Sequence, residues 1–222
     1  MKGKPRNLSE KKLWDLLAFV ERELGLYRFK NLNVAILFRK NFEKDTGNQG
    51  WVIYLDDYIK PREYLIEIDS NLKRKALIEA IIHEFVHVKQ WASGVMKDRG
   101  HRVFAKKRYD HTIPYKEQPW EIDAYETQDA LYSKYEEKNM TKIEKLVKVL
   151  SSGRELTTAQ IQKQVGFSSA SAVTSAIRTL RSQGHCVYRN ETSNGVKYRL
   201  GRPSRAIVSA AFEAAGSDVF TR

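Results

Sequence analysis

Two histidines separated by three residues are the chemically most informative feature of this chain. The run His83-Glu84-Phe85-Val86-His87 has the form H-E-x-x-H. On a helix, side chains four residues apart lie on the same face, so both imidazoles can reach one metal ion. Neutral imidazole is a preferred zinc ligand, and the glutamate after the first histidine can take a proton from a water that the ion activates. The pattern therefore predicts Zn²⁺ as the cofactor, His83 and His87 as ligands and Glu84 as the catalytic base.

The residues around this motif favour a helix. Between residues 71 and 92 the chain has no proline and no glycine. Asp69 and Ser70 offer side-chain oxygens for an N-terminal cap, and Gly94 is a natural end. Apolar residues at intervals of three and four predict one buried face, and the two histidines lie on a separate stripe. The alternative interpretation is a pair of solvent-facing histidines on an amphipathic helix.

A zinc site of this kind needs a third protein ligand, and the sequence offers more than one. Glu121 lies just after Pro119, and a proline followed by an acidic, helix-forming run predicts a second helix over roughly residues 119–137. A carboxylate in its first turn would complete a set of two histidines and one glutamate. His101 is the rival ligand and Asp123 a further one. We favour Glu121.

One part of the chain resembles a known group of metallopeptidases. The run 117–125 closely resembles short phage-encoded gluzincin-like proteins, which also have a start similar to the run 83–90. In the gluzincin third-ligand motif a small residue follows the ligand glutamate after three positions, as Ala124 follows Glu121. The resemblance covers roughly residues 30–130 and implies a zinc metallopeptidase of a phage or prophage.

Another segment resembles a different group. The stretch 97–104 is similar to the third-histidine segment of SprT-like proteases, in which a short loop after H-E-x-x-H ends in a histidine followed by an aromatic residue. In that group glycine usually comes directly after the ligand histidine, whereas Arg102 follows His101 here. This resemblance would make His101 the third ligand, so it competes with the gluzincin resemblance.

Residues 1–139 are predicted to form a small α+β zincin domain. Apolar residues recur on one face of the run 9–24, which predicts an amphipathic helix. Three apolar-rich runs, Asn33–Arg39, Trp51–Leu55 and Tyr64–Asp69, are separated by turn compositions and predict a three-stranded sheet. A helix, three strands, the H-E-x-x-H helix, a loop and a second helix follow the order of a minimal zincin domain. The resemblance implies that a protein or peptide substrate lies along the sheet edge beside the metal.

The segment between the ligands holds candidates for stabilising the negative charge that develops on the scissile carbonyl oxygen. Tyr109, His111 and Tyr115 have suitable donors, although packing against the sheet explains each of them as well. Asp123 or Glu126 would orient a ligand histidine from behind. A solvated helix face explains these two carboxylates equally.

Residues 140–201 are predicted to form a DNA-binding domain. A helix over 143–150, a short helix opened by a Thr157–Gln160 capping box, a turn at Gly166 and a longer third helix precede a hairpin whose tip contains Asn194-Gly195. This order resembles the winged helix-turn-helix of many phage and bacterial regulators. A protein-interaction module is the alternative. The residues predicted to contact double-stranded DNA are Ser171, Thr174, Ser175, Arg178 and Arg181 on the third helix and Arg189, Lys197 and Arg199 on the hairpin.

Charge is distributed unevenly along the chain, whose net charge is +12. Residues 1–140 have 26 Lys and Arg against 22 Asp and Glu, a net charge of +4, and residues 141–222 have 13 against 5, a net charge of +8. A basic excess in the shorter part favours a polyanionic partner such as nucleic acid. Residues 202–222 are predicted to be a basic, alanine-rich tail, for which a docking helix, a dimerisation element and a loose end all stay open.

Composition narrows the class of protein. Of the 222 residues 41% are hydrophobic, which is ordinary for a folded protein. No apolar run reaches the ~18–20 residues of a membrane span, and the charged start lacks the apolar stretch of a secretory signal. The single cysteine, Cys186, excludes an internal disulfide framework and a cysteine-rich zinc site. These features predict a cytoplasmic protein without a membrane partner, in the host cytoplasm if it is phage-encoded, with the virion as an alternative.

Together, these patterns predict a zinc metallopeptidase with a C-terminal DNA-binding domain. Tethering the protease to DNA would concentrate cleavage on DNA-associated proteins, in a phage or prophage context. The alternative is a non-catalytic DNA-binding or virion-associated structural protein that retains a zincin scaffold.

Overall fold

The H-E-x-x-H run lies within a helix of 20 residues. In the computed structural model, helix α3 spans Arg74–Ser93 and ends at Gly94, whose φ of 77° is a left-handed conformation that glycine adopts without strain. The predicted N-terminal cap is wrong, because strand β3 (Glu63–Asp69) extends to Asp69 and the helix begins only at Arg74. The Asp69 carboxylate instead accepts the backbone N–H groups of Glu43 and Asn71 at 2.9 and 2.7 Å.

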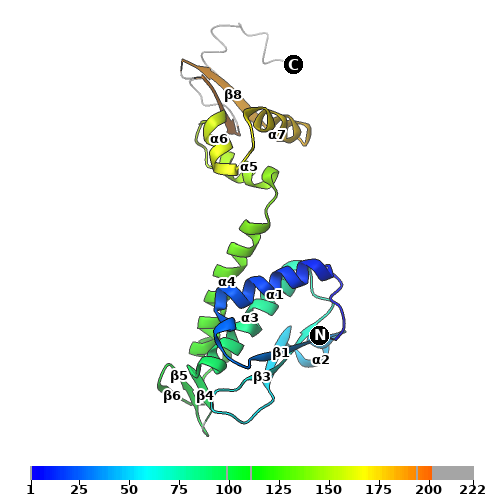
Figure 1. The fold of residues 1–222 in the computed structure, drawn as a ribbon, viewed down its shortest axis with the longest axis vertical. Helices are drawn as coiled ribbons and strands as arrows, with labels where there is room; N and C mark the ends of the chain where they lie inside the picture. Colours follow the sequence, from blue (N-terminus) through cyan, green and yellow to red (C-terminus); the bar gives the residue numbers. More distant parts are fainter. Residues whose placement is uncertain (1, 99, 111, 194, 202–222) are drawn as a thin grey trace. The chain divides into compact units, whose positions relative to one another are not determined.

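The chain folds as two units, shown as a ribbon in Figure 1. The structure describes residues 2–98, 100–110, 112–193 and 195–201. The first unit comprises Met1–Lys138 and the second Asn139–Arg222. Each unit combines helices with small sheets, so the protein is of the α+β class. The predicted tail at 202–222 lies outside the described residues. Within the described ranges no helix is both long enough and apolar enough to cross a membrane.

The first unit contains a mixed three-stranded sheet in the order β1-β3-β2, where β1 is Asn33–Arg39 and β2 is Gly50–Tyr54. β1 is parallel to β3 and β2 is antiparallel to it, so β2 lies at an edge. The three predicted strands are confirmed to within one residue at each end. The remaining helical elements of the unit are α1 (Glu10–Leu24), η1 (Leu26–Arg28), α2 (Phe42–Thr46), η2 (Tyr115–Glu117) and α4 (Pro119–Asn139).

Helix α3 is the centre of the first core. Its residues Leu77, Ile78, Ile81 and Ile82 are each 0% exposed. One side packs against α1, which lies along it in Figure 1, and another packs against β2 and β3. Burial of these aliphatic side chains is the main stabilising term available to the unit. It also holds the histidine stripe at a fixed distance from the sheet.

Helix α4 is fixed to the first unit at points distant from Glu121. The guanidinium of Arg74 donates to both carboxylate oxygens of Glu136, at 2.8 and 3.2 Å. The Tyr135 ring packs on Phe19, with ring centroids 5.3 Å apart. Because Glu121 lies in the first turn of the same helix, these contacts set the direction in which α4 passes the histidine stripe. The predicted second helix is confirmed.

Residues 96–109, for which the sequence predicts no regular structure, form a second sheet. Strands β4 (Met96–Asp98), β5 (Arg102–Phe104) and β6 (Lys107–Tyr109) pair antiparallel in that order. Each strand has 3 residues, too few to show a period of two in the sequence. Phe104 and Tyr109 pack on Trp120 with ring centroids 6.4 and 5.9 Å apart, so this sheet rests on the first turn of α4.

The second unit has a core of its own. Helices α5 (Lys142–Leu150), α6 (Thr158–Val165) and α7 (Ala170–Ser182) pack on a sheet of order β7-β9-β8, formed by Leu156–Thr157, Gly195–Leu200 and Val187–Thr192. The capping box of Thr157 and Gln160 is confirmed, and so is the antiparallel hairpin of β8 and β9. The short strand β7, which closes the sheet against β9, was not predicted.

Candidate metal centre

Helices α3 and α4 bring two histidines and one glutamate together. The Nε2 atoms of His83 and His87 are 3.1 Å apart. Glu121 places one carboxylate oxygen 3.2 Å from the first Nε2 and the other 3.4 Å from the second. These residues are 7%, 7% and 6% exposed. Among the described residues, this is the group of histidine and carboxylate ligands that could hold a metal ion.

The spacing of the three ligands fits a tetrahedral ion. Bonds of about 2.0–2.1 Å to nitrogen and oxygen ligands require neighbouring ligand atoms about 3.3–3.4 Å apart, because a tetrahedron's edge is about 1.6 times its centre-to-corner distance. The two Nε2 atoms are 3.1 Å apart, and each lies close to that edge length from a different oxygen of Glu121, at 3.2 and 3.4 Å. Two helices have therefore brought two imidazole nitrogens and one carboxylate to spacings that suit a single small ion.

A glutamine fixes the tautomer of His87. The Gln90 side-chain nitrogen donates to the Trp120 carbonyl oxygen at 2.9 Å and to the Asp123 carboxylate at 2.8 Å. Both partners only accept, so the amide oxygen of Gln90 must point the other way, toward Nδ1 of His87 at 2.8 Å. Nδ1 therefore carries a proton, and when the ring is neutral Nε2 has the lone pair that a metal ion needs.

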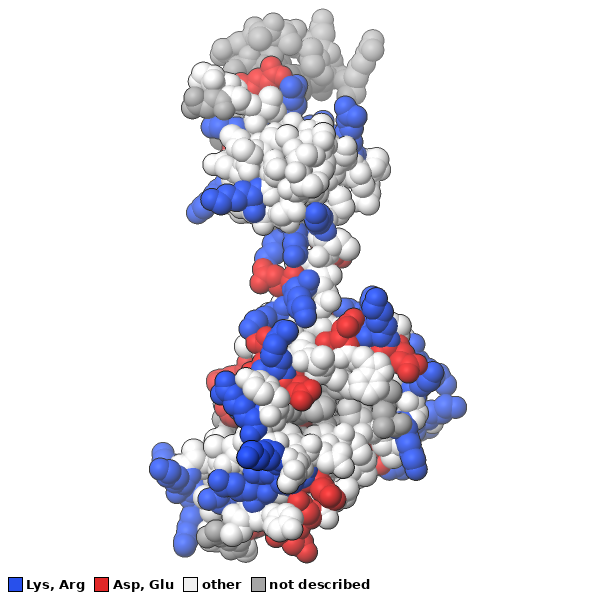
Figure 2. Space-filling model, in the orientation of Figure 1, with Lys and Arg blue, Asp and Glu red and all other residues white. Residues whose placement is uncertain are grey.

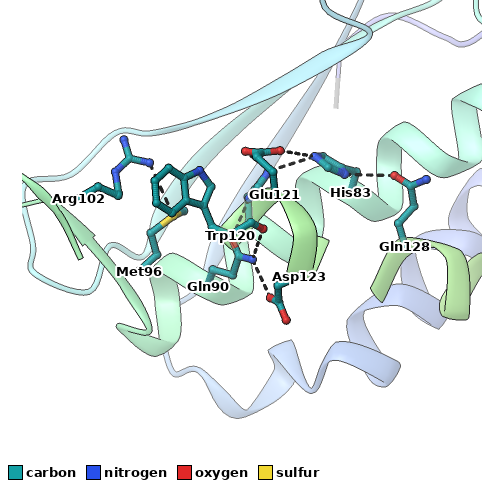
Figure 3. A network of polar contacts seen from close by, with 9 residues as sticks. His83, Gln90, Met96, Arg102, Trp120, Glu121, Asp123 and Gln128 are labelled. Atoms are coloured by element: carbon teal, nitrogen blue, oxygen red, sulfur yellow. Dashed lines mark hydrogen bonds and ion pairs between the residues drawn. The ribbon is translucent and has the colours of Figure 1, made fainter. Parts of the chain in front are cut away.

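A second glutamine orients His83 in the same way. The Gln128 oxygen lies 3.1 Å from Nδ1 of His83, and its nitrogen donates to Asp129 at 3.4 Å. Figure 3 shows this line of contacts from Glu121 through His83 to Gln128. The Tyr125 ring covers the imidazole, with ring centroids 4.6 Å apart. Metal-binding histidines usually donate their other ring N–H to such an acceptor, which fixes the ring and raises its basicity.

These tautomers decide what the site can hold. Two neutral imidazoles would turn their nitrogen lone pairs toward each other and toward a carboxylate at 3.1–3.4 Å inside a buried region. Proton acceptors brought together in this way repel one another unless a metal cation or a proton lies between them. Burial acts to lower the pKa of His87, but the contact with Glu121 outweighs it and raises that pKa, so without an ion a proton fills this place. The alternative of two solvent-facing histidines is wrong, because both rings are buried.

The pKa values of the two carboxylates of the site, Glu84 and Glu121, shift in opposite directions. Burial raises the pKa of Glu84, and the nearby histidines oppose this only in part. Burial also acts to raise the pKa of Glu121, but hydrogen bonding to His83 and His87 outweighs it and lowers the pKa of that group. A divalent cation at the three ligands would favour the ionised form of both carboxylates. Glu121 is thus held as an anion, as a ligand must be.

A cleft of about 530 Å³ runs past the metal centre. Its lining includes Glu84, the three ligands and strand β2. Gly50 allows the start of β2 to lie close to α3, since a Cβ there would be 3.1 Å from the Glu67 carbonyl oxygen and 3.4 Å from Glu84 Cγ. The catalytic candidate and an edge strand therefore border the same cavity.

The structure separates the competing third ligands. Glu121 lies with His83 and His87, whereas His101 is half-buried in the turn between β4 and β5, outside this group. Asp123 is exposed and acts at one remove, because it accepts from Gln90 and Gln90 accepts from His87. Glu126 is exposed. We predicted that a carboxylate would orient a ligand histidine. Instead Gln90 orients His87, and the Asp123 carboxylate orients Gln90.

The three residues predicted to donate a hydrogen bond to the scissile carbonyl oxygen differ in exposure and in contacts. Tyr115 is half-exposed and lines the cleft beside Glu84. Burial and the neighbouring Glu121 carboxylate raise the pKa of its hydroxyl, which therefore stays protonated at neutral pH. Tyr109 packs on Trp120, which is the packing role that we gave as the alternative to hydrogen-bond donation. His111 lies outside the described residues.

The predicted DNA-contacting residues of α7 lie on two parts of its surface. Ser171, Ser175 and Arg178 are exposed at intervals of four and three, opposite the buried stripe. The hydroxyl of the half-buried Thr174 donates to the Ala170 carbonyl oxygen at 3.2 Å. The Arg181 guanidinium donates twice to the Val187 carbonyl oxygen, at 2.9 and 3.2 Å, so it ties α7 to β8 within the unit.

The basic residues of the hairpin lie on opposite faces of its sheet. Tyr198 is buried, so the alternation along β9 directs Lys197 and Arg199 to the outer face. Arg189 pairs in register with Tyr198 and therefore shares its face, where it forms an ion pair with Glu191 at 2.7 Å. In the view of Figure 2 the Lys and Arg of this unit stand at separate places.

Comparison of the chain with protein-family models, with curated proteins and with solved structures gave no match.

The two glutamines were not predicted, although their spacing from the ligands can be read from the sequence. Gln90 follows His87 by three residues and Gln128 follows Glu121 by seven, so each lies on the ligand-bearing face of its helix. Many residues share such positions by chance, and only the packing of α3 on α4 shows which amides meet a histidine.

Removal of the third ligand should empty the site. We expect Glu121→Ala to lose bound metal, because two histidines alone leave an incomplete coordination set, and His101→Ala to keep about one ion per chain. The measurement is metal content by mass spectrometry after reconstitution with Zn²⁺. Loss of metal from His101→Ala but not from Glu121→Ala would contradict the assignment.

Loss of the Gln90 amide should weaken metal binding without abolishing it. Gln90→Ala frees the His87 ring and leaves its Nδ1 without an acceptor, so we expect metal affinity to fall about 10–100-fold. Competition with a chromogenic chelator measures the change, and Lys89→Ala, an exposed neighbour on the same helix, is the control. Equal affinities for the two variants would show that the amide does not orient the ligand.

Proposed function

We propose that this protein is a zinc-dependent metallopeptidase whose second unit binds double-stranded DNA. The observation that carries the proposal is the triangle of His83, His87 and Glu121 with both histidines oriented by glutamines. Glu84 borders the same cleft one residue after the first ligand. Each of these features is needed for metal-assisted hydrolysis, and together they account for the burial of four polar side chains.

The ligand set favours zinc in a catalytic role. Two imidazoles and one carboxylate, at spacings close to a tetrahedral edge, suit this ion. Structural zinc sites use four protein ligands, whereas catalytic sites use three and leave one position for water or substrate. The described residues supply three. When bound, zinc would polarise the scissile carbonyl and make water a stronger nucleophile near neutral pH.

The residues of the chain then have separate tasks. Glu84 is buried at the cleft wall, where its carboxylate can accept the proton of the attacking water and pass it to the leaving amine. Tyr115 stays protonated beside Glu121 and can donate to the carbonyl oxygen as its negative charge develops. The histidines and Glu121 hold their positions through Gln90 and Gln128.

The substrate class follows from the edge strand. The outer side of β2 has no strand partner among the described residues, and β2 lines the cleft. An extended peptide can add to such an edge through backbone hydrogen bonds, which suits an enzyme that cleaves the backbone. The substrate is therefore an extended or unfolded segment of a protein.

The second unit supports the DNA-binding part of the proposal. Three helices followed by a hairpin are the arrangement of a winged helix-turn-helix, in which the third helix enters the major groove. On α7 the small residues Ser171 and Ser175 lead to Arg178 along one exposed stripe, and Lys197 and Arg199 share the outer face of the hairpin. Attachment to DNA would raise the concentration of the protease near DNA-associated proteins to around millimolar. A phage or prophage context belongs to this proposal.

Replacement of the base should separate chemistry from structure. We expect Glu84→Gln to lower cleavage of a fluorescein-labelled unfolded protein about 10²–10⁴-fold, because general base catalysis is lost, while bound zinc is retained. Lys89→Ala should cleave like the wild type. Wild-type protein that binds zinc but cleaves nothing, with and without added duplex DNA, would favour the non-catalytic scaffold.

Substitution of the exposed arginine on α7 should weaken DNA binding. For a duplex selected from a random-sequence pool, we expect Arg178→Ala to cost about 1–3 kcal/mol, with affinity that falls as salt rises. Arg154→Ala, which removes an exposed charge in the turn before β7, is the matched control. Fluorescence anisotropy gives both constants, and equal affinities would indicate a protein-docking role for α7.

A further inference from the structure

Arg102 lies in the wall of the cleft that contains the metal centre, and neither the metal site nor the catalytic base uses it. It begins strand β5 of the small sheet. Its side chain is 26% exposed, so most of it is buried, and the residue is part of the lining of the cleft. The guanidinium is always charged, and burying a cation without a full set of partners is unfavourable. A partner that binds in the cleft would offset this cost.

Two tryptophans hold the guanidinium in place. Its central carbon lies 5.1 Å from the Trp91 ring centroid and 5.2 Å from the Trp120 ring centroid, within the range of cation–π attraction. Trp91 comes one helical turn after His87, and Trp120 comes directly before Glu121. The arginine is therefore positioned by the same two helices that position the ligands. Figure 3 shows Arg102 and Trp120 on one side of Glu121, with His83 on the other.

The hydrogen-bonding capacity of Arg102 is mostly unused within the described part of the chain. Its Nε is buried and has no acceptor there. One terminal nitrogen faces the Met96 sulfur at 3.7 Å, a weak acceptor, and the other lies 3.5 Å from Asp98. Guanidinium is a planar fork that matches a carboxylate with two parallel hydrogen bonds, and this pairing is not made here.

The charged residues nearby favour an anion beside Arg102 and disfavour one in a neighbouring cavity. The small sheet is basic, and Figure 2 shows Lys and Arg gathered in the region where Figure 1 places β4 to β6. A second cavity, which shares His83 and Glu84 with this cleft, is lined by the acidic residues Glu43 and Glu79. The described basic residues of the small sheet and its turns are Lys97, Arg102, Lys106, Lys107 and Arg108, against the single acidic residue Asp98.

We infer that Arg102 is a specificity subsite that binds the side-chain carboxylate of an Asp or Glu in the peptide substrate. This inference rests on the proposed peptidase function and specifies which peptides are preferred. Tyr54, at the end of β2, packs on Trp91 at 5.0 Å, whereas Gly50, at its start, lies beside Glu84. A peptide that pairs antiparallel with β2, the more stable arrangement, therefore passes Arg102 before it reaches Glu84. The acidic residue lies on the N-terminal side of the scissile bond.

The test is the cleavage of a synthetic pool of dodecapeptides with randomised sequence by zinc-loaded protein, read by mass spectrometry. We expect Asp and Glu to be enriched at one position before the cleaved bond. In Arg102→Gln this enrichment should fall at least about fivefold, because a charge-assisted, two-pronged contact is lost. Lys107→Gln removes an exposed charge from the same small sheet and should leave the enrichment unchanged.

A second variant acts in the opposite direction. Asp98→Asn removes the internal carboxylate that competes for the guanidinium, so we expect the enrichment to rise about twofold or more. This keeps the inference testable if Arg102→Gln fails to fold, which its zinc content and thermal unfolding would reveal. Cleavage without acidic enrichment, enrichment only after the cleaved bond, or full enrichment in Arg102→Gln would each overturn the subsite.

A binding arm separates this inference from the proposed chemistry. The same pool is passed over immobilised, zinc-loaded Glu84→Gln protein, which holds peptides without cutting them. Retained peptides should be enriched in Asp and Glu, and Glu84→Gln/Arg102→Gln should lose that enrichment. Retention of acidic peptides by a protein that never cleaves would overturn the peptidase alone. Absence of acidic preference among retained peptides, or absence of retention, would overturn the subsite.

Discussion

The structure depends on the convergence of three proton acceptors in a buried place. Two imidazole nitrogens and a carboxylate lie 3.1–3.4 Å apart, and glutamine oxygens hold a proton on the other nitrogen of both histidines. Such an arrangement is unfavourable unless a metal ion or a proton lies between the three groups, so the rest of the fold must stabilise it. The aliphatic face of α3, the ion pair of Arg74 with Glu136 and the packing of Tyr135 on Phe19 all serve this purpose. Metal binding and the packing of α4 on α3 must therefore stabilise each other.

The same two helices link the metal centre to the rest of the cleft. Trp91 and Trp120 neighbour ligands in sequence and hold Arg102 between their rings, while the small sheet that carries Arg102 rests on Trp120. Strand β2 also lines this cleft, and its outer edge has no strand partner among the described residues. In the proposed function, hydrolysis, backbone recognition and charge selection would therefore share one cavity. A change in the packing of α4 would then alter all three together.

In the second unit, the structure separates residues that look alike in sequence. Arg178 and Arg181 are three positions apart on one helix, but the guanidinium of Arg181 is engaged by the Val187 carbonyl oxygen. Arg189 and Arg199 both belong to the hairpin, yet the register places them on opposite faces. A positive charge is available to a polyanion only when its own fold does not use it, and a net charge cannot show this.

The sequence by itself determined the local features of this protein. The H-E-x-x-H spacing, the glycine after α3, the proline that opens α4, the three longer strands and the Thr157 capping box are short-range patterns, and residues a few positions apart are enough to define them. Only the tertiary structure shows that Glu121, and not His101, lies with the two histidines. It also shows that glutamine side chains contact both histidines, and that Arg102 lies between two tryptophans. The physical reason is range. Helix and strand periodicities depend on neighbours along the chain, whereas a ligand triangle depends on how two helices, 25 residues apart in sequence, pack to within a fraction of an ångström.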